Sequence, residues 1–148
     1  MFTRMLAALA LLVVLGCGAA PGGTPVPPPP PPQPQLKFTL DPSGTTIDYN
    51  KTVLHLQTPT GPSTVPLTGG AYTKTGGPYG SYTAWLDIYW VERFTGMVNN
   101  FNGQSVPGLL DWQPGKSTQG LFTLEIEQPN NSNGVPSRPL LTFKRTVG

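Results

Sequence analysis

The sequence predicts an all-β domain over residues 36–148, built as a small antiparallel β-sandwich or a small barrel. Segments rich in threonine, tyrosine, valine and tryptophan are separated by glycine and proline at intervals of about eight to twelve residues. Runs of alanine, glutamate and lysine, which favour helices, are nearly absent. Within residues 120–127, the apolar Phe122, Leu124 and Ile126 alternate with the polar Thr123, Glu125 and Glu127. Together these patterns predict about seven or eight short strands.

Four candidate strands come first, at residues 36–40, 45–49, 52–57 and 64–67. In the first, Leu36, Phe38 and Leu40 alternate with polar residues, and an Asp-Pro-Ser-Gly turn follows at residues 41–44. The fourth contains Pro66, which cannot donate to a neighbouring strand, so we expect it at a sheet edge.

The segment 79–94 holds two of the three tryptophans and three of the five tyrosines. A helix over residues 82–94 is an alternative, because Trp85, Ile88 and Val91 are spaced by three, but the β-branched and aromatic content favours a strand. An extended chain divides this segment into two faces. The predicted core face contains Ala84, Leu86, Ile88 and Trp90, and the other contains Thr83, Trp85, Asp87, Tyr89, Val91 and Arg93.

The last two strands are expected at residues 120–127 and 140–146. Asparagine and glycine at 99–103 and 130–134 favour turns. Among β-architectures an immunoglobulin-like sandwich is the first choice, on strand number alone. The disulfide of that fold is missing, because the chain's one cysteine precedes the domain.

The second face of segment 79–94 is a candidate binding surface, because it mixes flat aromatic rings with hydrogen-bonding groups. We assign its ligand-binding residues as Trp85, Asp87, Tyr89 and Arg93. The alternative is that a central strand buries large residues on both sides, in which case Trp85 lies beneath a loop. Trp112 is expected to be a core residue or loop anchor.

The domain has few residues of the types that act in catalysis. We predict no enzymatic activity, no cofactor and no metal. The one histidine, His55, alternates away from two leucines and is expected to be a polar strand residue. Asp87 and Glu92 are five apart, so on a strand they face opposite sides and do not form a carboxylate pair. Glu125 and Glu127 share a polar face, which is typical of edge protection.

The amino terminus has the layout of an export signal, in which Arg4 precedes an uncharged apolar run and small residues surround Cys17. That run is too short to span a bilayer, which takes roughly 20 residues. The stretch Val14-Leu-Gly-Cys17 resembles the lipobox of bacterial lipoproteins. The resemblance covers the first seventeen residues and implies cleavage before Cys17 and acylation of its thiol. An ordinary secretory signal, cut for example after Ala20, is the alternative.

The sequence is therefore divided into a signal peptide at 1–16, a lipidated cysteine with a proline-rich stalk at 17–35, and one domain at 36–148. The stalk contains six consecutive prolines and no charge, so it favours an extended chain at about 3.1 Å per residue. The net charge of +2 carries no basic run, which argues against nucleic-acid binding.

The expected partners are a membrane, through the lipid, and an envelope protein or a glycan. Residue 18 is glycine and not the aspartate that often retains lipoproteins at an inner membrane, so we expect the outer membrane in a host that has two. Protein binding or envelope assembly is the leading hypothesis. A glycan- or wall-binding module and a small envelope hydrolase are the alternatives.

Overall fold

The computed structural model describes residues 26–93, 95–127 and 138–147. The signal peptide, Cys17 and the predicted turn at 130–134 lie outside the described residues. Residues 26–31 belong to a separate unit and are exposed without regular structure. No helix in the described part of the chain has the length and apolar character needed to cross a membrane.

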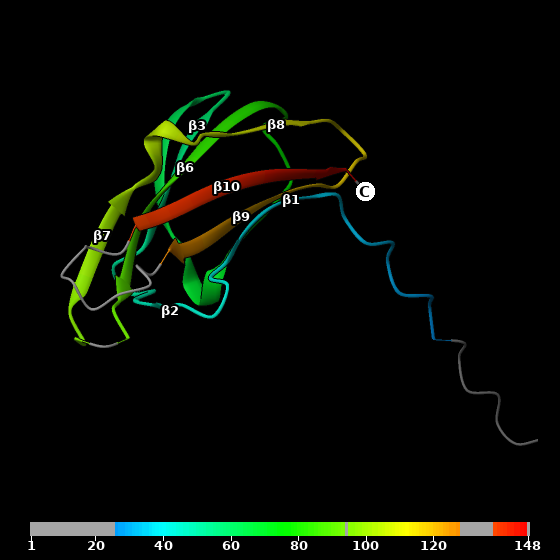
Figure 1. Cartoon of the computed structure of the whole chain (residues 1–148). Helices are drawn as coiled ribbons and strands as arrows, with labels where there is room; N and C mark the ends of the chain where they lie inside the picture. The colour runs from blue at the N-terminus through cyan, green and yellow to red at the C-terminus, as the bar shows by residue number, and fades with distance from the viewer. Residues whose placement is uncertain (1–25, 94, 128–137, 148) are drawn as a thin grey trace, which may run out of the picture. The chain divides into compact units, whose positions relative to one another are not determined.

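The domain is all-β, as the sequence predicts, and its strands form two sheets that do not close into a barrel (Figure 1). The four-stranded sheet has the order β10 (Arg138–Val147), β9 (Thr118–Glu127), β1 (Gln35–Asp41), β5 (Ala71–Thr75). The six-stranded sheet contains β2 (Thr46–Ile47), β3 (Val53–Thr58), β4 (Gly61–Pro66), β6 (Gly80–Val91), β7 (Val98–Asn102) and β8 (Gly108–Trp112). Short 3-10 turns lie at η1 (Thr68–Gly70) and η2 (Gly103–Ser105).

The twelve-residue strand β6 is the centre of the six-stranded sheet. Asp87 pairs with Val53 of β3 and also with Asn102 of β7, so those two strands lie on opposite sides of β6. β8 pairs with the first half of β6, on the same side as β7. β4 continues the sheet beyond β3 and forms its edge.

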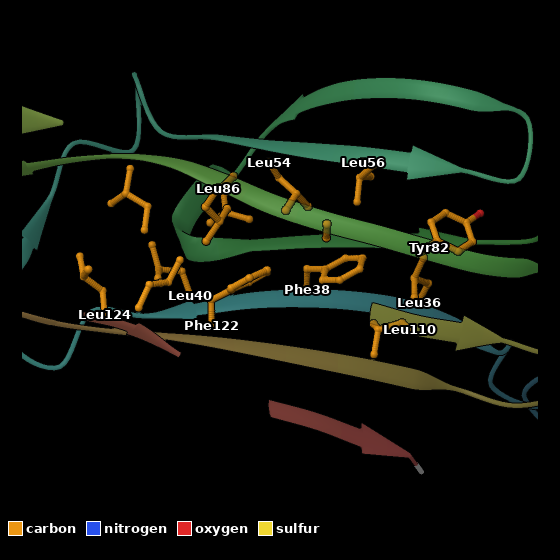
Figure 2. Packing of buried hydrophobic residues seen from close by; sticks show 14 of the residues in the cluster. Leu36, Phe38, Leu40, Leu54, Leu56, Tyr82, Leu86, Leu110, Phe122 and Leu124 are labelled. Atoms are coloured by element: carbon orange, nitrogen blue, oxygen red, sulfur yellow. The ribbon is translucent and has the colours of Figure 1, made fainter. Parts of the chain in front are cut away.

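The hydrophobic core lies between the two sheets. The alternate side chains Leu36, Phe38 and Leu40 of β1 are buried, as are Phe122 and Leu124 of β9. Figure 2 shows them pointing toward Leu54 and Leu56 of β3 and Leu86 of β6. The strict period of two in the sequence thus places one apolar face of each sheet against the other. Trp112 is fully buried in this core, and its Nε1 donates to the carbonyl of Lys116 at 2.9 Å.

Several features of the strand pattern differ from the sequence prediction. The strand expected at 45–49 is only two residues long, and β5 and β8 were not anticipated. Residues 99–103, predicted as a turn from their asparagines, form β7 and the start of η2. The sandwich is also not wholly antiparallel, because β1 and β9 run parallel over six paired positions. Pairing with β6 overrides the turn preference of asparagine in β7, as tertiary context commonly does for β-propensity.

The last strand, β10, packs against the six-stranded sheet through Phe143, whose ring lies between two glycines. A Cβ on Gly120 of β9 would lie 2.6 Å from the Phe143 ring, and a Cβ on Gly108 of β8 would overlap the same ring. Leu141 reaches Gly103 of η2 in the same way, since a Cβ there would lie 2.8 Å from Leu141 Cδ2. Three glycines therefore make the recesses that receive the inward side chains of β10.

Candidate binding surfaces

The outward face of β6 carries three of the predicted ligand residues. Burial alternates along the strand, so that Tyr82, Ala84, Leu86, Ile88 and Trp90 are buried. Trp85, Asp87 and Tyr89 lie on the opposite face and are partly buried. The fourth, Arg93, follows the end of the strand, is exposed, and lines a cavity described below. The structure therefore brings Trp85, Asp87 and Tyr89 to one face of the sheet. Arg93 is not part of that face and lies at the cavity.

The Trp85 ring is stacked on His55 of β3. The two residues are directly paired across the strands, with ring centroids 5.3 Å apart and planes 9° from parallel. Cross-strand neighbours stand side by side on a sheet, which brings flat side chains into this contact. One face of Trp85 is consequently covered by an imidazole.

Both nitrogens of His55 are engaged by neighbouring strands. Nε2 lies 2.9 Å from Asp87 Oδ2, and Nδ1 lies 3.1 Å from Thr64 Oγ1 of β4. The side chains of His55 and Asp87 are 24% and 25% exposed. The second carboxylate oxygen, Asp87 Oδ1, is buried, and among the described residues it has no hydrogen-bond partner. A network of polar groups thus joins the strands β6, β3 and β4 on this face.

A hydroxyl, an imidazole and a carboxylate in line are the components of a nucleophilic relay. Here, however, the hydroxyl belongs to an exposed residue of the edge strand, and all three groups stand on an open sheet face. The imidazole also packs against Trp85. This arrangement fixes the register of β4 on β3, and none of its three groups lines the cavity described below.

Exposed apolar side chains occur on the strands β7, β8 and β10 and just before β7. Met97 and Leu109 are each 63% exposed, Val98 is 47% exposed and Leu140 is 46% exposed. Met97 precedes β7, Val98 begins it, Leu109 is in β8, and Leu140 is in β10, which the Phe143 contact brings against β8. We call the strands β7, β8 and β10 the apolar edge. Figure 1 shows β10 in red beside the yellow β8.

A cavity of about 930 Å³ lies at the strand ends of both sheets. Its walls come from the turn between β1 and β2, from residues 90–93 at the end of β6, and from Glu125 and Ile126 of β9. Trp90, which the sequence places on the core face, is buried as expected, yet it does not join the main hydrophobic cluster. No sequence pattern indicated this cavity, because its walls come from segments far apart in the chain.

Burial raises the pKa of Tyr72 on β5 and of Tyr82 on β6 above the usual value. For Tyr82 the neighbouring Tyr72 adds to the increase. Tyr82 also donates its hydroxyl to the carbonyl of Pro78 at 2.6 Å. These tyrosines stay protonated at neutral pH.

Over the ranges that the structure describes, no cluster of three or more histidine, cysteine or acidic side chains could hold a metal ion. Comparison of the chain with protein-family models, curated proteins and solved structures found no match.

Proposed function

We propose that this chain is a lipid-anchored envelope protein whose domain binds a partner protein through the apolar edge and catalyses no reaction. The observation that supports this most directly is the long strand β10, which pairs with a neighbour on one side only and carries the exposed Leu140. Further exposed apolar side chains lie on β7 and β8, and exposed apolar surface is a feature of interaction sites.

The strand β10 is the longest edge strand in the described part of the fold. It pairs with β9 at ten consecutive positions without a bulge, and with no other described strand. The other edges are blunted, since β4 carries Pro62 and Pro66 and β5 has only five residues. An unpaired row of backbone N–H and C=O groups is a template on which a partner can add a strand.

The charge of β10 indicates which partner segment fits. It contains Arg138, Lys144 and Arg145 and no acidic residue, with the exposed Leu140 among them. An extended segment that carries acidic and apolar side chains would complement this strand. Steering by such charges acts mainly on the rate of association and on specificity.

The anchor is proposed from the sequence around Cys17. Two or three acyl chains there would bury methylene groups at about 0.8 kcal/mol each, enough to hold the domain at a membrane. Expression of the full chain and of Cys17→Ser, followed by membrane fractionation and mass spectrometry, tests this. We expect the unmodified variant to leave the membrane fraction. Equal membrane retention of both chains would contradict the anchor.

Site-specific photocrosslinking in the native envelope tests the partner surface. A benzophenone side chain at Leu109 or at Leu140 should capture the same protein, while one at Thr73 on β5 should capture none. Lys144→Glu should abolish capture at Leu140, whereas Lys74→Glu on the opposite edge should leave it intact. A crosslink between two copies of this chain, or equal capture at both edges, would contradict the proposal.

A glycan-binding face on β6 is the second candidate. Trp85 and Tyr89 stand on the same face, both partly exposed, with Asp87 between them. His55 occupies one side of the Trp85 ring and one oxygen of Asp87, which leaves less of this face for a sugar. Sedimentation of the purified chain with cell-wall glycan, compared with Trp85→Ala, distinguishes it. Binding that is lost in that variant, with an unchanged circular dichroism spectrum, would favour the glycan.

A further inference from the structure

The free side of strand β10 offers the consecutive residues 140–146 to another strand. Among the described strands, β10 pairs only with β9. Residues of an antiparallel pair alternate between those that bond to the neighbouring strand and those that do not, so β10 also has backbone N–H and C=O groups directed away from β9. Pro139 has no N–H to donate, so the uninterrupted row of such groups begins after it. A strand laid beside residues 140–146 can form a regular ladder.

Two adjacent cations in this stretch have no acidic residue directly opposite them on β9. Lys144 lies opposite Leu121. Arg145 lies opposite Gly120. Both side chains are exposed, and neither forms an ion pair with a described residue. Opposite charges directly across a ladder stabilise a strand pair, and like charges destabilise it. Lys144 and Arg145 therefore favour two consecutive acidic residues on an added strand.

The first half of the stretch is apolar on both of its faces. Leu140 is 46% exposed and lies opposite Glu125, on the outward face of the four-stranded sheet. Leu141 points inward and is buried, and Phe143 points inward and is partly buried. Directly opposed residues of neighbouring strands have their side chains on the same face of the sheet. Apolar residues opposite these three positions would therefore remove further apolar surface from water.

We infer that the partner protein adds an antiparallel strand to β10, with acidic residues opposite Arg145 and Lys144 and apolar residues opposite Phe143, Leu141 and Leu140. Read from its amino end, the partner's segment has two acidic residues, one apolar residue, one position without a requirement, and two apolar residues. Antiparallel pairing is the more stable of the two directions per residue. This mode of binding rests on the function proposed above and adds to it the direction and the order of the partner's side chains.

Two synthetic peptides of equal composition and charge test the direction. The first, Thr-Glu-Glu-Val-Thr-Val-Val, places its glutamates opposite Arg145 and Lys144 when it runs antiparallel to residues 140–146. The second has the reversed sequence, Val-Val-Thr-Val-Glu-Glu-Thr, and makes the same matches only in a parallel ladder. Each carries fluorescein at its amino end and is titrated with the full chain, with fluorescence anisotropy as the readout. We expect the first to bind about tenfold more tightly, a difference of roughly 1.4 kcal/mol.

Hydrogen exchange of the ¹⁵N-labelled full chain tests whether the backbone takes part. When the first peptide is bound, alternate amides within residues 140–146 should exchange more slowly, because their N–H groups then donate to the added strand. The amides of β5, at the other edge of the same sheet, should exchange as before. Unchanged exchange in β10 with the peptide bound would show attachment by charge alone and would overturn the inference.

Charge reversal provides a matched set of variants. The double variant Lys144→Glu with Arg145→Glu should lose binding of the first peptide and gain binding of Thr-Lys-Lys-Val-Thr-Val-Val. Lys74→Glu on β5 is the control and should leave both affinities unchanged. Equal or tighter binding of the reversed peptide would also overturn the inference.

Failure of this inference is distinct from failure of the proposed function. Capture of a partner protein from Leu140 by crosslinking, with no binding of either peptide, would overturn the strand order and direction and leave the partner surface in place. Absence of any captured protein at Leu109 and Leu140 would overturn the proposed function itself, and this inference with it.

Discussion

The two edges of the sandwich are held in different ways. At the edge formed by β4, polar groups join the strands, because Thr64, His55 and Asp87 form a chain of hydrogen bonds across β4, β3 and β6. At the apolar edge, the Phe143 ring sits in a recess made by Gly108 and Gly120. Partly exposed polar pairs contribute little net stability, whereas buried aromatic contacts contribute several-fold more. The difference suggests that the first network mainly sets register and the second holds the sheets together.

Removal of the Phe143 ring should give the largest effect. We expect Phe143→Ala to lower the free energy of unfolding by about 2–3 kcal/mol, somewhat less than for a fully buried phenylalanine because the ring is half-buried. Urea unfolding followed by tryptophan fluorescence measures it. Thr73→Ala on the opposite sheet edge is the control, and its effect should stay within about 0.5 kcal/mol. Equal losses in the two variants would end the distinction between the edges.

Filling the glycine recess should come next. Gly108→Ala introduces a Cβ where the Phe143 ring lies, so it should cost about 1–3 kcal/mol of stability through overpacking. In the Phe143→Ala background the same change should cost almost nothing. A double-mutant cycle measures this coupling. Additive losses would show that Gly108 matters for a reason other than the ring.

The contacts of the Phe143 ring with Gly108 and Gly120 could not be predicted from the sequence. Alternation in residues 36–40 and 120–127 was enough to predict β1 and β9, because a one-sided apolar face is a local pattern. The parallel pairing of these strands, and the meeting of Phe143 with Gly108, depend on chain direction and register between distant segments. A local sequence pattern contains no information on chain direction or on register between distant strands.

The candidate sites also have some features that local alternation predicts and others that depend on the pairing of distant strands. The outward direction of Trp85, Asp87 and Tyr89 follows from alternation alone. The stack of Trp85 on His55 does not, because it depends on the register of β3 against β6. The cavity beside Trp90 combines three segments of the chain, so no local pattern predicts it. The prediction of a turn at residues 99–103 is wrong because asparagine is common in turns, whereas here these residues pair with β6.

Disruption of the polar edge should have a smaller effect. His55→Ala and Asp87→Asn should each lower the free energy of unfolding by about 0.5–1 kcal/mol, since both side chains keep some contact with water. The double variant should lose little more than either single variant, because both changes break the same bond. Denaturant unfolding measures all three. A loss as large as that of Phe143→Ala would make this network a main source of stability.

The smallest expected effect concerns alkaline pH at β5. The folded chain holds the pKa of Tyr72 above 10, so the unfolded chain releases this proton first as pH rises. The contribution of Tyr72 is therefore present below pH 10 and is lost as pH rises through the folded pKa. Tyr72→Phe should match the parent near pH 7 and lose stability less steeply above pH 10. If the free energy of unfolding fell equally steeply with pH in the parent and in Tyr72→Phe, this prediction would be wrong.

The parallel pairing of β1 with β9 also sets the order in which the domain can fold during synthesis. β1 cannot complete its sheet until β9 is available, and Phe143 closes the recess only when β10 follows. Pairing between such distant segments is slow to form. Under the proposed export, a chain that enters a membrane channel from its amino end could not complete this sandwich until almost all of it had passed.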